Sequence, residues 1–370
     1  MAKIGVDTKV IFEQILLPLL RHSLNSYAGA NCRNGFSDSL LQKLHNLNGN
    51  SWSKLVQIAK EQTISGIFYS AICDLPDEIC VPDSILFELI ATADRIEREN
   101  HFIEQRTLKL MKFFDSHNLK PIVLKGREVA KFYPNPYLRE CGDIDIYFDG
   151  NNFEKAKELV TKSGRNIYHS PDGSIHYSYQ KTENQIDTLY IDQHKAYYDL
   201  ATSAQQLPQP SSNEATLLML SSHIMKHCIG AGVGLRQICD IALAYRALDG
   251  QYNKAELVDA FRKSGTLKFN YLLTSFVYNY LGINESPFDE KEAADARALS
   301  PLPLLKIIEQ GGNFGHHEST RKKALKKSSF RRKLNTLALF AKRLPFSLRY
   351  APKEALSTIL KLGGGNLTKI

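Results

Sequence analysis

The sequence feature that most constrains the fold is the alternation of residues 143–148, Asp-Ile-Asp-Ile-Tyr-Phe. Strict alternation predicts a strand with one buried face. Because residues i and i+2 project from one face, we expect Asp143 and Asp145 side by side, with Ile144 and Ile146 pointing into the core. Neighbouring carboxylates both stay ionised only beside a cation. The pattern therefore predicts a site for a hard divalent cation such as Mg²⁺, or else a solvated strand face.

A second feature precedes this strand. The apolar, β-rich run 121–124 ends at Lys125 and Gly126, and a helical stretch follows from Arg127. A strand that turns through glycine into a helix presents free backbone N–H groups, where an anion can bind and approach the main chain closely. Lys125 and Arg127 would add positive charge. The pattern is compatible with a phosphate site and equally with an ordinary helix start.

A third acidic position lies in the expected strand 185–194. Alternation puts Tyr190, Asp192 and His194 on one face, whereas Asp187 falls on the opposite face and is the poorer candidate. Asp192 would become a third carboxylate if this strand lies beside the first acidic strand. Three carboxylates are a common way to hold the two metal ions that phosphoryl and nucleotidyl transfer use.

The succession of elements predicts an α+β protein. We expect an N-terminal helical region over 1–117, a small α+β core over 118–205, a C-terminal helical region over 206–318 and a basic C-terminal segment over 319–370. Periodicity and turn residues place the expected elements within these regions. The expected helices cover 10–24, 51–71, 83–114, 127–132, 152–163, 212–229, 254–264, 268–281 and a stretch that begins near 235, and the expected hairpin pairs 174–180 with 185–194.

Composition excludes several classes of protein. Hydrophobic residues make up 43% of the chain and charged residues 23%, which excludes a disordered, collagen-like or coiled-coil chain. No apolar run of about 20 residues lacks charge, so no membrane span is expected. The first residues lack the apolar core of a signal peptide, and six scattered cysteines form no CxxC pair. We therefore expect a reducing, cytoplasmic setting; the sequence indicates no oligomeric state.

Positive charge is concentrated near the C-terminus. Residues 321–353 contain twelve lysines and arginines and no acid, which leaves a mildly acidic remainder of the chain. Three interpretations stay open for this segment: a solvated helical face that docks on the acidic body, a surface for anionic membranes, or a surface for RNA or DNA. The overall charge is therefore not a nucleic-acid signal for the whole protein.

These motifs together resemble the uncharacterised nucleotidyltransferase family, which belongs to the polymerase-β-like nucleotidyltransferase superfamily. The resemblance spans about residues 40–315. It rests on Pro121-Ile-Val-Leu-Lys-Gly, Tyr133-Pro134, Arg139, Gly142-Asp143-Ile-Asp145 and Ile191-Asp192-Gln193-His194, with weaker support from Ser51-Trp52, Ile64-Ser65-Gly66, the His223/His227 pair, residues 235–240 and residues 312–315.

The resemblance implies a small mixed-sheet nucleotidyltransferase core and the metal-dependent transfer of NMP from an NTP, with release of pyrophosphate. It implies Asp143, Asp145 and Asp192 as catalytic metal ligands for Mg²⁺ or Mn²⁺. It also implies that Lys125 and Gly126 lie near the triphosphate, with Arg127 as a further contact, although Arg127 stands where the wider superfamily has serine. ATP is the expected nucleotide, and the acceptor, a small molecule, sugar or protein, is not identified. A non-catalytic nucleotide-binding module is the alternative.

The sequence indicates further residues that could line the nucleotide-binding cleft, but less sharply. His223 and His227 share one helical face and are read as a packed pair, a metal-binding pair or cleft lining. Arg236 and Asp240 have the spacing of a helix ion pair, whereas the resemblance suggests that His227 or Arg236 lines the cleft. For Arg139, an anchor of the carboxylates and a phosphate contact are equally open. The resemblance makes all three basic residues, Arg139, His227 and Arg236, candidates for nucleotide binding, and His176 is a weaker candidate.

Overall fold

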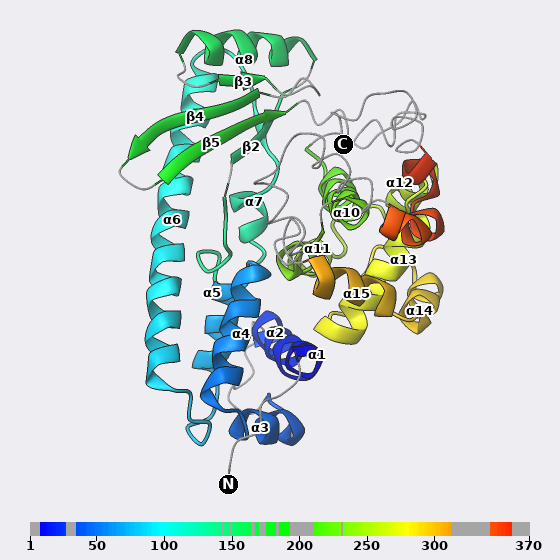
Figure 1. The fold of residues 1–370 in the computed structure, drawn as a ribbon. Helices are drawn as coiled ribbons and strands as arrows, with labels where there is room; N and C mark the ends of the chain where they lie inside the picture. The colour runs from blue at the N-terminus through cyan, green and yellow to red at the C-terminus, as the bar shows by residue number, and fades with distance from the viewer. Residues whose placement is uncertain are drawn as a thin grey trace.

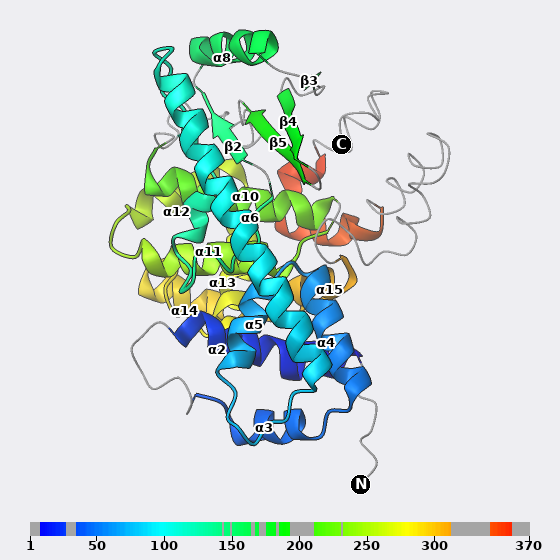
Figure 2. The same ribbon diagram turned by 90° about the vertical axis from the view of Figure 1, so that its left-hand side faces the viewer.

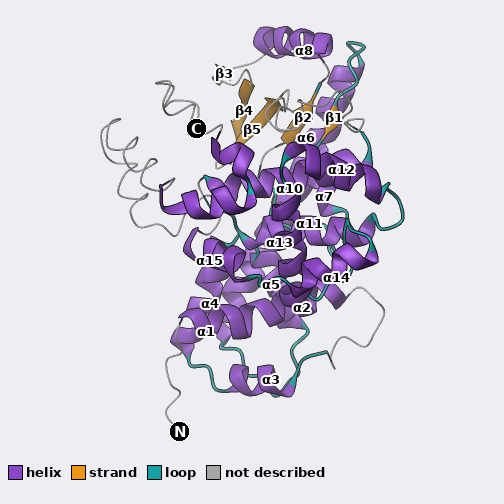
Figure 3. Ribbon diagram, turned by 90° about the vertical axis from the view of Figure 1, so that its right-hand side faces the viewer, coloured by secondary structure: helices purple, strands orange, loops and turns teal. Residues whose placement is uncertain are grey.

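The computed structural model describes ten stretches of the chain, and all structural statements below refer to them. They are residues 8–26, 35–142, 144–148, 150–163, 167–169, 175–182, 185–192, 211–230, 232–311 and 341–356. Strands occur only at one end of the molecule, and helices form the rest of the described structure (Figure 1, Figure 3).

The N-terminal third is helical, as expected. Side chains cap two of its helices, because Ser37 accepts a hydrogen bond from the Leu40 amide and Asn48 accepts one from the Ser51 amide. The long helix α6 runs from the sheet to the far end of the molecule (Figure 2). The elements are α1 (Thr8–Ile11), the π-helical turn η1 (Phe12–Leu16), α2 (Leu17–Asn25), α3 (Asp38–His45), α4 (Gly49–Glu61), α5 (Ser65–Cys73) and α6 (Asp83–Asp115).

The expected continuous helix over 51–71 is wrong, because α4 ends at Glu61 and α5 begins at Ser65. Thr63 between them has a positive φ of 54°, which a helix cannot contain. The break turns Gln62 inward, where it is fully buried. Its Oε1 accepts a hydrogen bond from the Leu235 amide at 2.9 Å, and its Nε2 donates to the Ile308 carbonyl at 3.2 Å. The break therefore ties the N-terminal helices to the C-terminal ones.

The middle of the chain forms a five-stranded mixed sheet in the order β1-β2-β5-β4-β3. Strand β2 is parallel to β5, and the other neighbouring pairs are antiparallel. The expected strands and helices agree with the observed ones to within a few residues, and β3 is an addition. The elements are β1 (Ile122–Val123), α7 (Arg127–Ala130), β2 (Ile144–Tyr147), α8 (Gly150–Ser163), β3 (Ile167–His169), β4 (Ile175–Thr182) and β5 (Gln185–Asp192).

The two faces of β2 have different surroundings. Ile146 is buried with Phe148 in a small core that includes Phe114 of α6 and Phe153 of α8, and Ile144 packs against it. This is the apolar face that the alternation predicts. The opposite face carries Asp145 and is directed toward α7, α10 and α11 (Figure 1). The sheet thus keeps one face for its own core and leaves its polar face toward the helical body.

The C-terminal helices pack with the N-terminal ones in a single large core that extends from Ile11 to Ala351. The bounds of the helices expected from sequence are close to those observed, except that the last turn of the expected helix 268–281 is a π-helix. The elements are α10 (Asn213–Ile229), α11 (Leu235–Ala247), α12 (Lys254–Ser264), α13 (Leu267–Phe276), η4 (Val277–Leu281), α14 (Glu290–Ala298) and α15 (Leu302–Gly311), followed by a helix over 341–350. Helices α14, α15 and the helix over 341–350 were not expected.

The helices and cysteines bear on two expectations about the cell environment. Among the helices of the described stretches, none combines the length and apolar character that crossing a bilayer requires. The five cysteines for which the structure gives a state, Cys73, Cys80, Cys141, Cys228 and Cys239, are all free thiols. The basic clusters over 321–333 lie outside the described residues.

Candidate active site at the polar face of the sheet

The turn between β1 and α7 needs glycine at its centre. Gly126 has φ 61° and ψ −116°, a backbone conformation that a Cβ atom disfavours strongly. The Leu124 amide donates a hydrogen bond to the Asp145 carbonyl at 3.1 Å, which holds the start of this turn against β2. The expected glycine turn is therefore present, and it brings Lys125 to the polar face of the acidic strand.

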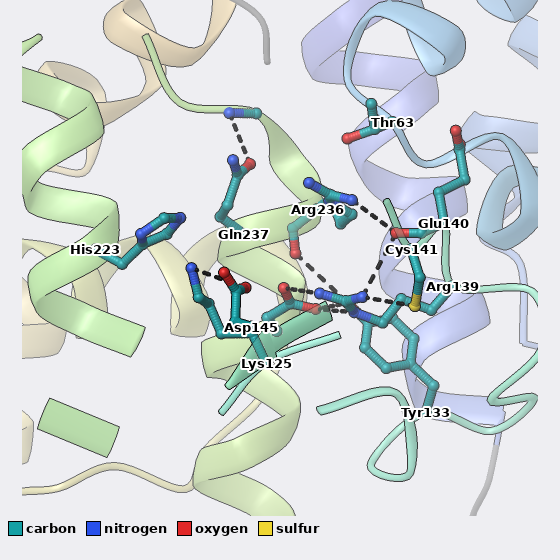
Figure 4. A network of polar contacts seen from close by, with 12 residues as sticks. Thr63, Lys125, Tyr133, Arg139, Glu140, Cys141, Asp145, His223, Arg236 and Gln237 are labelled. Carbon is teal, nitrogen blue, oxygen red and sulfur yellow. Dashed lines mark hydrogen bonds and ion pairs between the residues drawn. The ribbon is translucent and has the colours of Figure 1, made fainter. Parts of the chain in front are cut away.

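Lys125 and Asp145 form an ion pair across this turn. Lys125 Nζ lies 3.2 Å from Asp145 Oδ2, and the two side chains are 16% and 6% exposed (Figure 4). A carboxylate buried to this degree needs a cationic partner, because burial disfavours its charged form. The ammonium group meets that need here, and a carboxylate in this position is also the donor type that a hard divalent cation prefers.

The third acidic position lies on the neighbouring strand. Strand β5 pairs in parallel with β2, with Tyr190 opposite Asp145 and Asp192 opposite Tyr147. His176 of β4 pairs with Tyr190, so positions 145, 190 and 176 form one row across three strands. Alternation along β5 places position 192 on the same sheet face as this row. The sheet therefore brings two of the three expected acidic positions to adjacent strands; Asp143 and His194 lie outside the described residues.

A buried ion pair fixes the loop that leads into β2. Arg139 binds Asp240 of α11 through both arms, with Nε–Oδ1 and Nη2–Oδ2 distances of 2.7 Å each. The Tyr133 hydroxyl donates to Asp240 Oδ1 at 2.6 Å, and Arg139 Nη1 also contacts Cys141 Sγ at 3.1 Å. Arg139, Asp240 and Tyr133 are each at most 4% exposed. Because both arms of the Arg139 guanidinium bind Asp240, we no longer propose Arg139 as a contact for the nucleotide.

Burial and the Arg139–Asp240 ion pair shift the pKa values of Tyr133 and Arg139. Burial raises the pKa of the Tyr133 hydroxyl well above its ordinary value, and the negative charge of Asp240 raises it further. For Arg139, burial acts to lower the pKa, but Asp240 outweighs it and the pKa stays well above the ordinary value. Tyr133 therefore remains a neutral hydrogen-bond donor, and Arg139 remains a cation.

The expected Arg236–Asp240 helix pair is absent, because Asp240 binds Arg139 instead. Arg236 Nη1 donates to the Glu140 carbonyl at 2.7 Å (Figure 4). The Glu140 carboxylate accepts a hydrogen bond from the Ser65 amide at 2.8 Å. Helix α5 begins after Ile64, which offers no capping side chain, so Glu140 supplies the missing acceptor. The loop before β2 is thus anchored to both α5 and α11.

Arg127 turns away from the glycine turn. Its Nη1 donates to the Pro136 carbonyl at 2.7 Å, its Nη2 to Glu104 Oε1 at 3.2 Å, and its guanidinium lies 4.4 Å from the centre of the Tyr137 ring. The Tyr137 hydroxyl donates to Glu104 Oε2 at 2.9 Å. Arg127 therefore connects the turn to α6, and a phosphate contact at this turn stays a prediction.

The histidine pair is formed as the spacing predicts. His223 and His227 of α10 are partly buried, with 3.1 Å between their Nε2 atoms. His223 extends toward the Lys125–Asp145 pair (Figure 4). Within the described part of the chain, no group of three or more His, Cys, Asp and Glu side chains is arranged to hold a metal ion. Because Asp143 lies outside those residues, the predicted carboxylate cluster stays a prediction.

Several residues that shape this site were not indicated by the sequence. Asn100 of α6 is buried and donates to the carbonyls of Tyr137 and Arg139 at 2.6 and 2.8 Å. Glu104, Glu140 and Gln62 act in the same way, by binding distant backbone or side-chain groups. Two sequence features could have revealed some of them. Helix α5 has no capping side chain at its start, which calls for a distant acceptor such as Glu140. Asn100 is a polar residue on an otherwise apolar face of α6.

Comparison with known sequences decides the family. A sequence model described as uncharacterised nucleotidyltransferase matches residues 48–282. The chain belongs to this family. The matched region begins just before α4 and ends after η4, so the family region contains the glycine turn, β2, β5, α10 and α11. No curated protein and no solved structure matches the chain.

Membership in the uncharacterised nucleotidyltransferase family supports nucleotidyl transfer as the general function of the chain. Tyr133, Arg139, Arg236 and Asp240 all lie inside the family region and converge on the loop that precedes β2.

Proposed function

We propose that this protein is a metal-dependent nucleotidyltransferase, which moves NMP from an NTP to an acceptor hydroxyl or other nucleophile and releases pyrophosphate. The observation that carries the proposal is the parallel pairing of β2 with β5, which sets Asp145 and position 192 on adjacent strands beside the Lys125–Gly126 turn. ATP is the proposed nucleotide, and the acceptor class is a small molecule, a sugar or a protein.

Asp143, Asp145 and Asp192 would hold Mg²⁺ or Mn²⁺. The buried carboxylate of Asp145 fits such an ion, because its charge already requires a cationic partner and its oxygens are hard donors. When bound, the ion would neutralise charge on the nucleotide phosphates and on the departing pyrophosphate.

The chain's own residues would bind and orient the nucleotide. Lys125 lies at the turn and can exchange its contact with Asp145 for a phosphate oxygen, as a compact cation on a flexible stem. Gly126 leaves room for a phosphate beside the main chain. Arg139, Asp240 and Tyr133 would act at a distance, by holding the loop that carries the chain into β2.

The direct test is transfer of label. Purified protein is incubated with Mg²⁺, a cell extract and each of the four α-labelled NTPs in turn, and products are separated by size and chemistry. We expect one nucleotide, ATP first, to label an acceptor while pyrophosphate appears in equal amount. A γ-labelled nucleotide should transfer no label, which separates this reaction from phosphoryl transfer of the terminal phosphate.

Matched variants make this test specific. Asp145→Asn should abolish transfer, whereas Asp94→Asn removes an exposed carboxylate of α6, which pairs with Arg98, and should leave transfer unchanged. Magnesium-dependent nucleotide binding without pyrophosphate release would contradict the enzyme proposal and favour the non-catalytic binding module. Full activity of Asp145→Asn would contradict the site.

Binding of nucleic acid or anionic membrane through residues 321–353 stays a separate proposal. Within the described part of this segment, two cations contact the body. Buried Arg343 donates to the Gly230 carbonyl, and Lys353 donates to the Lys263 carbonyl at 2.7 Å. These contacts favour docking for residues 341–356. Deleting 321–340 and measuring salt-dependent binding to RNA and to anionic vesicles would test the rest.

A further inference from the structure

We propose that the protein forms a homodimer, in which the outer face of α6 pairs antiparallel with the same face of a second copy. The inference does not depend on the proposed nucleotidyl transfer. In Figure 2, α6 lies in front of the rest of the described structure. The helix contains 33 residues, from Asp83 to Asp115, and is therefore about 50 Å long.

The outer face of α6 forms an exposed stripe along the whole helix. Three large apolar side chains lie on it, Phe87, Ile90 and Leu108, which are 70%, 43% and 58% exposed. Helical spacing aligns them with further exposed residues on the same face. The outer stripe consists of Asp83, Phe87, Ile90, Ala91, Asp94, Arg98, His101, Gln105, Leu108, Lys109 and Lys112. Single exposed apolar residues are ordinary, but this stripe also carries a pattern of charge that matches itself.

Charge is distributed unevenly along the outer stripe. The charged members before residue 97 are the acidic Asp83 and Asp94, and those after it are the basic Arg98, Lys109 and Lys112. A second copy aligned in parallel and in register would place like charges opposite each other. An antiparallel copy instead places the acidic part opposite the basic part, which is the favourable arrangement. Charge therefore selects the antiparallel orientation.

One register satisfies the apolar and the charged positions together. With a two-fold axis between positions 97 and 98, Phe87 lies opposite Leu108 of the second copy. The same axis brings Asp83 opposite Lys112 and Asp94 opposite His101. Each of these contacts occurs twice, because the interface is isologous. A shift by one heptad in either direction would instead set Asp94 or His101 opposite its own copy.

A hollow in α6 lies where the second copy would bring Phe87. Its volume is about 120 Å³, and the described residues that line it are Phe102, Gln105, Arg106 and Lys109. The Arg106 guanidinium lies 5.1 Å from the centre of the Phe102 ring. In the antiparallel register, Phe87 of the second copy lies opposite the turn that contains Gln105 and Lys109. An exposed aromatic ring and a hollow that can receive it therefore occupy matching positions.

Contacts within each chain restrain the middle of the outer stripe. Arg98 Nη2 lies 2.8 Å from Asp94 Oδ2, and the two side chains are 71% and 57% exposed. The two copies of Arg98 would approach each other at the axis, and each keeps Asp94 as its counter-charge. The His101 ring stacks on Tyr137, with 4.0 Å between ring centres, which restrains it before a second copy binds. Because Tyr137 belongs to the loop that leads into β2, the dimer interface would border that loop.

The first experiment measures the mass of the protein in solution. Sedimentation of the full chain over a wide range of concentrations should show a monomer–dimer equilibrium. Phe87→Lys places a positive charge opposite the basic part of the second copy and should raise the Kd of the dimer at least about tenfold. Leu302→Lys is the matched control, because it replaces an exposed apolar side chain of α15 and should leave the Kd unchanged. Circular dichroism checks that both variants are folded.

Cysteine crosslinking tests the orientation and the register. The background carries Cys32→Ser, Cys73→Ser and Cys80→Ser. In it, Ile90→Cys/Gln105→Cys should form a crosslinked dimer on mild oxidation, because these positions lie opposite each other in the proposed register. Ile90→Cys alone and Gln105→Cys alone should form none, since each position lies about 22 Å along the helix axis from its own copy.

Four results would overturn the proposal. A wild-type chain that stays monomeric at every concentration would refute the homodimer. Binding of a different protein to the outer stripe of a monomeric chain would refute it equally. A dimer that Phe87→Lys leaves intact and that the paired cysteines do not crosslink would use another surface. Crosslinking of either single-cysteine variant would show a different alignment of the two helices. None of these results depends on transfer activity, so the proposed function stands or falls separately.

Discussion

The ammonium group of Lys125 lies 3.2 Å from the carboxylate of Asp145, across the glycine turn between β1 and α7. Both side chains are largely buried, so each charge depends on the other for compensation. In the proposed reaction, the nucleotide with its divalent ion would replace this pairing. The two residues therefore should respond differently to substitution.

We expect Asp145→Asn and Asp143→Asn to abolish NMP transfer, because a carboxamide cannot replace an anionic metal ligand. Lys125→Met should retain some turnover. Loss of one charge-assisted contact costs about 1.5–3 kcal/mol, which corresponds to a reduction in kcat/KM on the order of 10- to 100-fold. The measurement is label transfer from α-labelled NTP, with circular dichroism to confirm folding. Equal loss of activity in all three variants would contradict the separate roles.

The buried Arg139–Asp240 pair should contribute mainly to stability. Asp240→Ala leaves the Arg139 guanidinium without its partner, and we expect the free energy of unfolding to fall by about 3–5 kcal/mol. The double variant Arg139→Met/Asp240→Leu removes both charges and should be less destabilised than Asp240→Ala. Urea unfolding measures both values. If the double variant is instead the less stable one, then the pair stabilises the fold beyond charge compensation.

Gly66 permits the close approach of α5 to the loop before β2. A Cβ atom at this position would lie 2.1 Å from the Leu138 carbonyl oxygen, so backbone must shift to admit it. We expect Gly66→Ala to lower stability by about 1–3 kcal/mol or more. Gly49→Ala is the matched control, since nothing lies within 4 Å of its added Cβ atom and it also lies in the first turn of a helix. Thermal unfolding of the two variants should therefore differ, and similar midpoints would contradict the contact.

The lowered pKa of Glu104 predicts how the stability of the fold depends on pH. Partial burial acts to raise its pKa, but hydrogen bonds from Tyr137 and Arg127 outweigh burial, and the pKa lies below the ordinary value. A carboxylate with a depressed folded-state pKa stabilises the fold above its unfolded pKa, and the contribution is lost as pH falls through the folded pKa. NMR titration should show the low pKa in the wild-type protein and a higher one in Arg127→Met. An unchanged value in that variant would exclude Arg127 as a cause.

Local pattern determined much of the site. Alternation over 143–148 was enough to place Asp145 on a polar strand face and Ile146 in a core, because a strand repeats every two residues whatever its surroundings. The glycine at 126 marked the turn for a similar reason, since few other residues adopt its backbone angles. The His223–His227 contact also follows from helical spacing alone.

Partner choice was decided only by the tertiary structure. Asp240 has Arg236 four residues away on its own helix, yet it binds Arg139, which is 101 residues distant in sequence. Likewise Arg127 turns from the glycine turn at Gly126 to Glu104 of α6. Thr63 interrupts a periodic helix, and Gln62 beside it joins three segments. Sequence spacing fixes which face a side chain occupies. Which charge it meets there depends on burial, because a charge removed from water must pair with whichever opposite charge the packing of distant helices brings within reach.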